Sequence, residues 1–458
     1  MTHILVVGND GTPDGFGRIN MEINSRLVRR GYRITAASLS YDGLLPPNYE
    51  GAPLPYHVAA MGGKPNWPEC VIAIANTVQP DIIHVVQDAP YCEIVRNLPL
   101  DWSRYGFMAT TPVDGVPIFP RWIEMMKQAD AALTISQFGV DAYRDEGAAV
   151  KLCRPAADAN KFFRLNSDER LALRAKLGLG AEHFIFGAFC QNQGRKSIPL
   201  MLRAFFRFAV DKPHARVFLD MEAASPAGWD IETLCIQQKW ERGKIIFRAD
   251  ALRAGVTEMN QRYNLLDVHA VISHREGFGI PLVESQACGV ATMALDYCSG
   301  PEIVANNCGV MVKSIDYTSP GTWGGAEDKF VDIDDMADKL RWLHDHPAER
   351  AAIAERGMAE SRRHTWDMAA DAVQAAIEQV VEKRKAIPPA NVPQHAITAP
   401  PMPIEPVVEV VPLTIMPMPQ WGSYAAAQAV ETVKSVVQAD GINANAGRIF
   451  DAPELFEG

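Results

Sequence analysis

The segment from Ser273 to Gly289 contains two glutamates, Glu276 and Glu284, separated by seven residues. Its sequence, SHREGFGIPLVESQACG, predicts the end of a strand, a glycine loop and a helix that begins near Pro281, because proline is favoured in the first helical turn. Unpaired N–H groups at a helix start bind anions, and the loop glycines let a ligand approach the backbone. Carboxylates on both sides of an anion site suit a ligand with hydroxyl groups at its two ends and phosphates between them. That is the chemistry of a nucleotide sugar.

The two glutamates also have a simpler interpretation. An ordinary loop acid at Glu276 and a helix-dipole partner at Glu284 would explain an isolated pair. The complete order of strand, EGFG loop, proline and helix favours the ligand site instead.

Short apolar runs and helical segments alternate in two blocks, one from Ile4 to Glu146 and one that starts at His183, with a linker at 153–165 between them. This alternation predicts an α/β protein with two Rossmann-like, doubly wound parallel sheets that face a cleft, where ligands bind outside the carboxyl ends of the strands. The expected domains are 1–160 and 161–385, followed by a Pro-rich extension at 386–458 with one short helix. The last helices of the second domain are expected to cross back to the first.

The composition narrows the class of protein. The chain has 458 residues, 44 basic and 55 acidic side chains and a net charge of −11, which disfavours a general nucleic-acid binder. Its 8 cysteines include no C-x-x-C pair, so reduced thiols are expected. No signal peptide and no membrane-length apolar stretch is visible, which predicts a cytoplasmic protein without an integral membrane segment. No metal site is expected, since Asp332, Asp334 and Asp335 are interpreted as a helix cap.

The stretch RYNLLDVHAVISHREGFGIPLVESQACGV resembles the signature of retaining glycosyltransferases of family 4, which have the GT-B fold. GFGRINMEINSRLVRRGYRIT is similar to that family's glycine loop and first helix, and QNQGRKSIPLMLRAF resembles its phosphate-contacting loop. Together with three shorter matches, the resemblance covers about residues 1–385.

The resemblance implies a role for each matching residue. Glu284 would hold the donor ribose, Glu276 and the backbone amides of the loop would hold the donor sugar and the distal phosphate, and Arg195 with Lys196 would neutralise the departing diphosphate. The physical chemistry agrees, because a departing diphosphate needs positive charge where its own charge develops. The expected donor-binding set is Arg195, Lys196, Glu276, Gly277, Phe278, Gly279, Ile280, Pro281, Leu282 and Glu284.

Two positions depart from the family pattern, and the role of one loop has two interpretations. Gln191 stands where the family usually has an arginine, so we expect either that Arg195 takes over that role or that the donor affinity is altered. The family's N-terminal histidine is missing, and Asp114 is expected to replace it as a catalytic contact beside Glu276 and Lys196; a turn aspartate before Gly115 is the alternative. We also expect one loop to reach the donor phosphates or the acceptor. It consists of Gly15, Phe16, Gly17 and Arg18. A tight turn between strand and helix would explain its glycines equally well.

The resemblance implies a retaining, metal-independent glycosyltransferase that needs no cofactor and uses a nucleotide-diphosphate sugar, by default a UDP-sugar, as co-substrate. The acceptor, a glycan, lipid, small molecule or modified nucleic acid, is not specified. Three alternatives stay open: a GT-B epimerase or phosphorylase, a transferase acting on modified DNA bases, and a non-catalytic nucleotide-sugar-binding protein. The Pro-rich tail carries several valines and isoleucines, so we expect it to lie against the body or a partner subunit.

Overall fold

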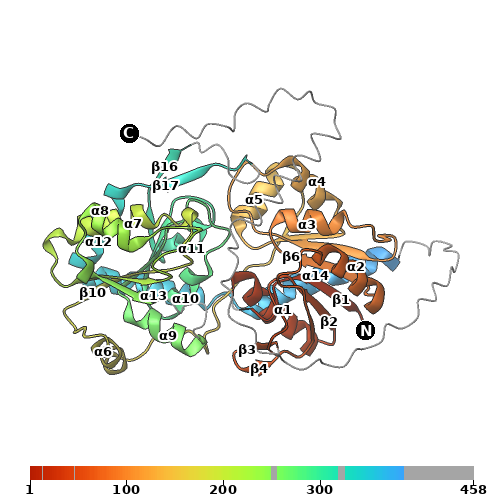
Figure 1. Cartoon of the computed structure of the whole chain (residues 1–458), viewed down its shortest axis with the longest axis horizontal. Coiled ribbons are helices and arrows are strands. Elements are labelled where there is room, and N and C mark those ends of the chain that lie inside the picture. The colour runs from red at the N-terminus through yellow and green to blue at the C-terminus, as the bar shows by residue number, and fades with distance from the viewer. Residues whose placement is uncertain (13, 46, 249–254, 318–324, 386–458) are drawn as a thin grey trace, which may run out of the picture. The chain divides into compact units, whose positions relative to one another are not determined.

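The computed structural model describes residues 1–12, 14–45, 47–248, 255–317 and 325–385 (Figure 1). All of these described residues belong to one compact unit by their contacts. The predicted Pro-rich tail at 386–458 lies outside the described residues.

The first sheet has seven strands in the order β5-β2-β1-β6-β7-β8-β9, all paired in parallel. Every residue of β1, β6 and β7 is buried, as expected for strands covered by helices on both faces. The strands are β1 (His3–Gly8), β2 (Arg33–Ser38), β5 (His57–Ala60), β6 (Ile82–Val86), β7 (Gly106–Thr110), β8 (Ala131–Thr134) and β9 (Lys151–Leu152). The helices between them are α1 (Gly15–Arg29), α2 (Trp67–Val78), α3 (Ala89–Arg96), α4 (Pro120–Gln128) and α5 (Gln137–Asp145).

The second sheet has six parallel strands in the order β12-β11-β10-β13-β14-β15. The strands are β10 (Phe184–Phe189), β11 (Ala215–Asp220), β12 (Ile245–Arg248), β13 (Val268–Val271), β14 (Ala291–Leu295) and β15 (Val310–Val312). The helices of this part are α6 (Ser167–Ala175), α7 (Ile198–Phe208), α8 (Ile231–Gln238), α9 (Val256–Leu265), α10 (Ile280–Ala287), α11 (Gly300–Ile303), α12 (Ile333–Asp345) and α13 (Pro347–Ser361). Two short antiparallel pairs, β3 (Asn48–Tyr49) with β4 (Ala52–Pro53) and β16 (Ser314–Tyr317) with β17 (Asp328–Val331), complete the strands. The two parallel sheets confirm the predicted α/β class.

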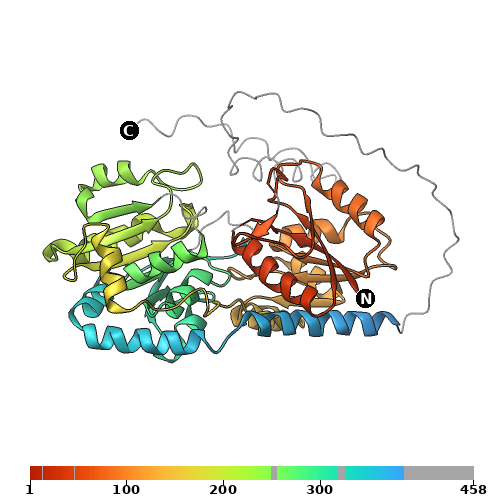
Figure 2. The ribbon, with the colours of Figure 1, turned by 90° about the horizontal axis from the view of Figure 1, so that it is seen from below.

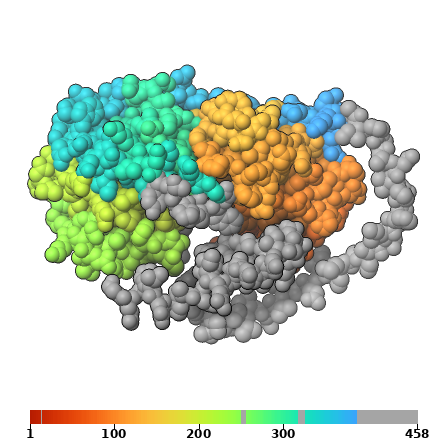
Figure 3. Space-filling view, turned by 90° about the horizontal axis from the view of Figure 1, so that it is seen from above, coloured from red at the N-terminus to blue at the C-terminus, as the bar shows by residue number. Residues whose placement is uncertain are grey.

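Side chains connect the two sheets. Glu302 at α11 accepts a hydrogen bond from the Phe138 backbone N–H (3.1 Å) and pairs with Arg154 (3.0 Å). Figure 3 shows the corresponding surfaces, gold and blue-green, in contact. The predicted boundary at residue 160 stays a prediction, since the contacts join both sheets into one compact unit.

The last described helix, α14 (Trp366–Lys385), packs against α1, β7 and β8 of the first sheet (Figure 2). Its Asp371 pairs with Arg30 of the first sheet's α1 end at 2.7 Å. Among the residues that the structure describes, no helix combines the length and the hydropathy that a bilayer-spanning segment needs.

The close packing of α14 gives a stability prediction. A Cβ atom at Gly106 would lie 2.5 Å from Val380 Cγ1 of α14, so Gly106→Ala must displace this helix. We expect Gly106→Ala to lower the free energy of unfolding by about 1–3 kcal/mol. Gly243→Ala is the control, since a Cβ there meets no atom within 4 Å and the change should stay within about 0.5 kcal/mol. Equal denaturation midpoints for the two variants would contradict this packing.

Several elements and one boundary differ from the sequence prediction. The helices α3, α6, α8 and α11 and the strands β3–β5, β9 and β15–β17 were not predicted, and α1 begins at Gly15 rather than near Ile19. The earlier start follows from Asp14, whose side chain accepts the Gly17 N–H (2.9 Å) and caps the helix.

Candidate active site

The EGFG loop joins the carboxyl end of β13 to α10. Gly279 is the N-cap residue of α10 and has φ +92°, a left-handed conformation that glycine adopts at little cost. The hydroxyl of Ser299 contacts the carbonyl oxygens of Glu276 (3.0 Å) and Phe278 (2.9 Å), which fixes the loop. The start of α10 therefore lies at the carboxyl ends of the second sheet's strands, although Pro281 has no N–H and the Leu282 N–H donates to the Gly279 carbonyl oxygen (2.9 Å).

Lys196 and Arg195 lie beside Glu276, although 80 residues separate Lys196 from it in the sequence. Lys196 Nζ is 2.7 Å and Arg195 Nη1 is 3.6 Å from Glu276 Oε2, and Ser273 Oγ donates to the same oxygen at 2.7 Å. Burial alone would raise the pKa of Glu276, but the two cations outweigh it and hold the pKa at about 2. Glu276 is therefore ionised at neutral pH.

The two cations come from the loop after β10, which ends in a short 3-10 helix, Gly194–Lys196. The Arg195 guanidinium donates to the carbonyl oxygen of Arg275 (3.1 Å), and the His274 N–H donates to the Arg195 carbonyl oxygen (2.8 Å). These bonds tie the cationic loop to the EGFG loop. Two positive groups and one carboxylate leave a net positive charge beside the start of α10, which suits an anion.

Glu284, predicted to hold a ribose, lies 1 % exposed on α10 and has protein partners at both carboxylate oxygens. Tyr263 Oη donates to Oε2 at 2.8 Å, and Oε1 pairs with Arg18 of α1. Burial raises the pKa of Glu284, and Arg18 offsets only part of this rise. In this conformation a ribose reaches Glu284 only by sharing or displacing Arg18.

The loop predicted to reach the phosphates has mainly structural contacts. A Cβ at Gly17 would lie 2.1 Å from the Thr12 carbonyl oxygen, so this glycine is required by the tight turn into α1. Phe16 packs against the apolar core, whereas Gly15 is exposed with open space beside it. Of the four predicted residues, the structure places Arg18 against the EGFG-containing segment, through Glu284.

Gly277 was predicted to make room for a ligand, but its free side faces the protein. A Cβ there would lie 2.7 Å from Pro112 Cβ, in the loop after β7. The side chains of Phe278, Ile280 and Leu282 are 2 %, 8 % and 1 % exposed, because they pack into the core. Within the predicted donor set, these three residues therefore offer a ligand only their backbone groups.

Asp114 lies in the loop after β7, with about half of its side chain exposed and Arg275 Nη1 3.9 Å away. Asp88, which the sequence analysis did not single out, follows the neighbouring strand β6. It remains accessible to water, but the protein packed around it raises its pKa to about 6, and the Asp114 charge adds to the rise. An aspartate directly after a buried parallel strand is a signal that could have revealed it.

The predicted helix cap at Asp332 is confirmed, since its carboxylate accepts the backbone N–H groups of Asp334 (3.0 Å) and Asp335 (3.1 Å). Gln191, the residue in place of the family arginine, accepts a hydrogen bond from Gln193 (2.7 Å). Arg195 is thus the arginine that the structure places at Glu276.

Solved structures with similar folds cover nearly the whole described chain. The sucrose-phosphate synthase of Thermosynechococcus elongatus superposes with a TM-score of 0.65 at 16 % identity, over 84 % of this chain and 100 % of that one. Anabaena Alr3699/HepE in complex with UDP-glucose gives a TM-score of 0.63 at 16 % identity, over 84 % and 100 % of the two chains. The fold is GT-B.

Sequence comparison adds information for one part of this GT-B chain. Residues 253–359 match the family model "Glycosyl transferases group 1". A D-inositol 3-phosphate glycosyltransferase of Stackebrandtia nassauensis is 26 % identical over 278 residues, 58 % of this chain and 57 % of that protein. The corresponding protein of Kineococcus radiotolerans is 26 % identical over 262 residues, 54 % and 55 % of the two chains. The match thus spans little more than half the length of these relatives.

The matched segment of the GT-B chain contains Glu276 and Glu284 but not the cationic loop. Lys196, Arg195, Arg18 and Asp114 lie outside it. Their place beside the segment follows from the geometry of the fold described above.

Proposed function

We propose that this chain transfers a sugar from a nucleotide-diphosphate sugar to an acceptor hydroxyl, with retention of the anomeric configuration. The observation that carries the proposal is the contact of Lys196 and Arg195 with Glu276 beside the start of α10. This arrangement offers positive charge and the backbone of the EGFG loop for a diphosphate, and a carboxylate for sugar hydroxyls.

The proposed reaction breaks the bond between the anomeric carbon and the diphosphate oxygen. Negative charge then develops on that oxygen, where Lys196, Arg195 and the backbone N–H groups of the EGFG loop stabilise it. Glu276, ionised because its pKa is about 2, accepts hydrogen bonds from the sugar hydroxyls. The acceptor hydroxyl attacks from the face of the leaving group and gives its proton to the departing phosphate, so the reaction needs no protein nucleophile. We propose that these fixed cations stabilise the leaving diphosphate without a metal ion.

The comparisons guide the choice of substrates. A solved structure with this fold contains UDP-glucose, and several relatives are D-inositol 3-phosphate glycosyltransferases. We therefore propose a UDP-sugar as the first donor to test and a hydroxyl-rich small molecule as the first class of acceptor. The carboxylates of Asp88 and Asp114, at the ends of β6 and β7, are the groups we assign to the acceptor hydroxyls.

A donor screen tests the proposal. Thermal unfolding of the full chain is followed with UDP-, GDP-, ADP- and dTDP-sugars. The true donor, at about 100 times its dissociation constant, should add roughly 2.7 kcal/mol of stability. The selected donor is then incubated with and without acceptors, and the products are identified by NMR. A retained glycosidic product supports the proposal. An epimerised sugar nucleotide, an inverted product or the absence of any stabilising donor contradicts it.

A further inference from the structure

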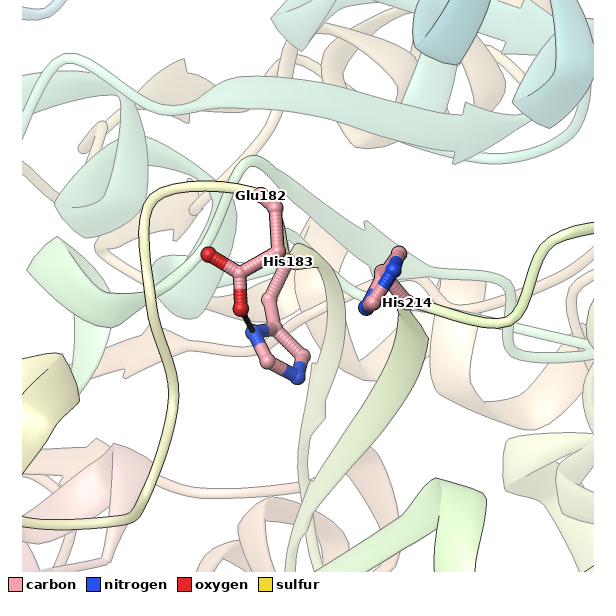
Figure 4. Close-up of side chains that lie close together, drawn as sticks. All are labelled: Glu182, His183 and His214. Carbon is pink, nitrogen blue, oxygen red and sulfur yellow. Dashed lines mark ion pairs between the residues drawn. The ribbon is translucent and has the colours of Figure 1, made fainter.

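Two histidines lie side by side at the amino ends of β10 and β11. Because Phe184 is in register with Ala215, the preceding residues His183 and His214 are neighbours across the sheet. The Phe184 N–H donates to the His214 carbonyl oxygen at 3.1 Å, which fixes this register. The two rings are 5.5 Å apart between centroids and nearly perpendicular, at 81° (Figure 4). The backbone ladder, rather than flexible side chains, thus brings the two imidazoles together.

A carboxylate lies beside one of the two rings. Glu182 Oε1 lies 2.9 Å from His183 Nδ1, and the same nitrogen is 3.0 Å from the Gly180 N–H. When His183 Nδ1 accepts the Gly180 N–H, it carries no proton of its own. The nitrogen lone pair and the Glu182 carboxylate oxygen then repel each other unless a proton or a cation lies close to both. The pKa of Glu182 is lowered, chiefly by its own backbone N–H against the effect of burial, with smaller contributions from His183 and His214.

We propose that Glu182, His183 and His214 form a binding site for a divalent transition-metal ion such as Zn²⁺. One ligand atom from each residue lies within 4.8 Å of the others. Zn²⁺ takes nitrogen and carboxylate oxygen ligands at about 2.0–2.2 Å, so binding requires a modest inward movement of the side chains. The Glu182 side chain is 54 % exposed and has the freedom to make it. Across the part of the chain that the structure describes, no other group of three such side chains comes this close.

The position of this site predicts what the metal does. His183 and His214 precede two parallel strands, whereas Glu276 follows the carboxyl end of β13 in the same sheet. The metal site therefore lies at the amino ends of the sheet's strands and the proposed transfer site at their carboxyl ends. A metal here would clamp the starts of two neighbouring strands and stabilise the second sheet, without contacting the donor.

The test uses the full chain, stripped of metal with a chelator and dialysed. Zn²⁺ is titrated calorimetrically and its effect on the unfolding temperature is measured. We expect one Zn²⁺ to bind and to raise the unfolding temperature, and His214→Ala to weaken that binding by at least about tenfold. His57→Ala removes an exposed histidine of β5 and should leave the affinity unchanged. Mg²⁺ and Ca²⁺ at the same concentration should have no effect, since imidazole ligands favour transition metals.

Two results would contradict the proposed metal site. One is equal Zn²⁺ affinity in the original chain and in His214→Ala, which would place any bound metal elsewhere. The other is a dissociation constant above about 1 mM in the original chain, which would mean that the cluster is not a metal site. If His214→Ala loses its fold by circular dichroism, Glu182→Gln, which keeps the side-chain shape, takes its place with the same expected loss.

Discussion

Lys196→Ala is expected to lower kcat of sugar transfer by about 10²–10³-fold, because the variant loses a positive group beside the position where the leaving diphosphate gains charge. The side chain lies 2.7 Å from Glu276 and is anchored on the loop after β10, so its position is set by the fold rather than by the ligand. The measurement is a steady-state transfer assay with the donor found by the screen.

Lys176→Ala is the matched control for this variant. Lys176 is an exposed lysine at the end of α6, so its removal changes the net charge equally but leaves the site intact. We expect full activity in the control. Equal kcat values for the two variants would contradict the assignment of Lys196 to the site.

Glu276→Gln is expected to have the second large effect, a fall in kcat of about 10²–10³-fold. The variant keeps the shape of the side chain but removes the anion that orients the donor sugar and balances Lys196 and Arg195. Because those two cations then lack their carboxylate, we also expect the free energy of unfolding to fall by about 1–3 kcal/mol at neutral pH. Glu146→Gln, on an exposed residue after α5, is the control for both readouts.

The pH dependence of this variant separates the charge of Glu276 from its packing. The folded-state pKa of Glu276 is lowered from 4.5 to about 2, so its ion pairs stabilise the protein above pH 4.5 and are lost as the pH falls toward 2. The original chain should therefore lose stability in this window relative to Glu276→Gln, and the difference should disappear below about pH 2. A difference that is constant with pH would mean that Glu276 is not held as an ion.

The fold was predictable because its parallel strands are short apolar runs with sharp ends. The largely apolar runs at 82–86, 106–110 and 215–220, for example, form β6, β7 and β11. Helix α6 was missed even though its start carries a local signal, the reciprocal capping of Asn166 and Glu169. Helix α8 has little amphipathic patterning, so its sequence offered a weaker signal.

The site was predictable only in part. Family resemblance indicated that Lys196 and Glu276 belong together, and the structure places them in contact. The pairing of Arg18 with Glu284 joins residues 266 positions apart on two sheets, and no local pattern encodes such a contact. For the same reason, the close approach of Gly277 to Pro112, which comes from the other sheet's loops, could not be predicted. The histidine pair followed from the register of β10 and β11, which the sequence alone does not specify.

Calorimetric titration of the screened donor nucleotide into the original chain, Lys196→Ala and Lys176→Ala tests the central claim most directly. If Lys196 and its neighbours hold the donor diphosphate, the dissociation constant rises at least about tenfold in Lys196→Ala, a loss of 1.4 kcal/mol or more, and stays unchanged in Lys176→Ala. Equal dissociation constants in all three proteins would contradict the assignment of the diphosphate to the Lys196–Glu276 cluster.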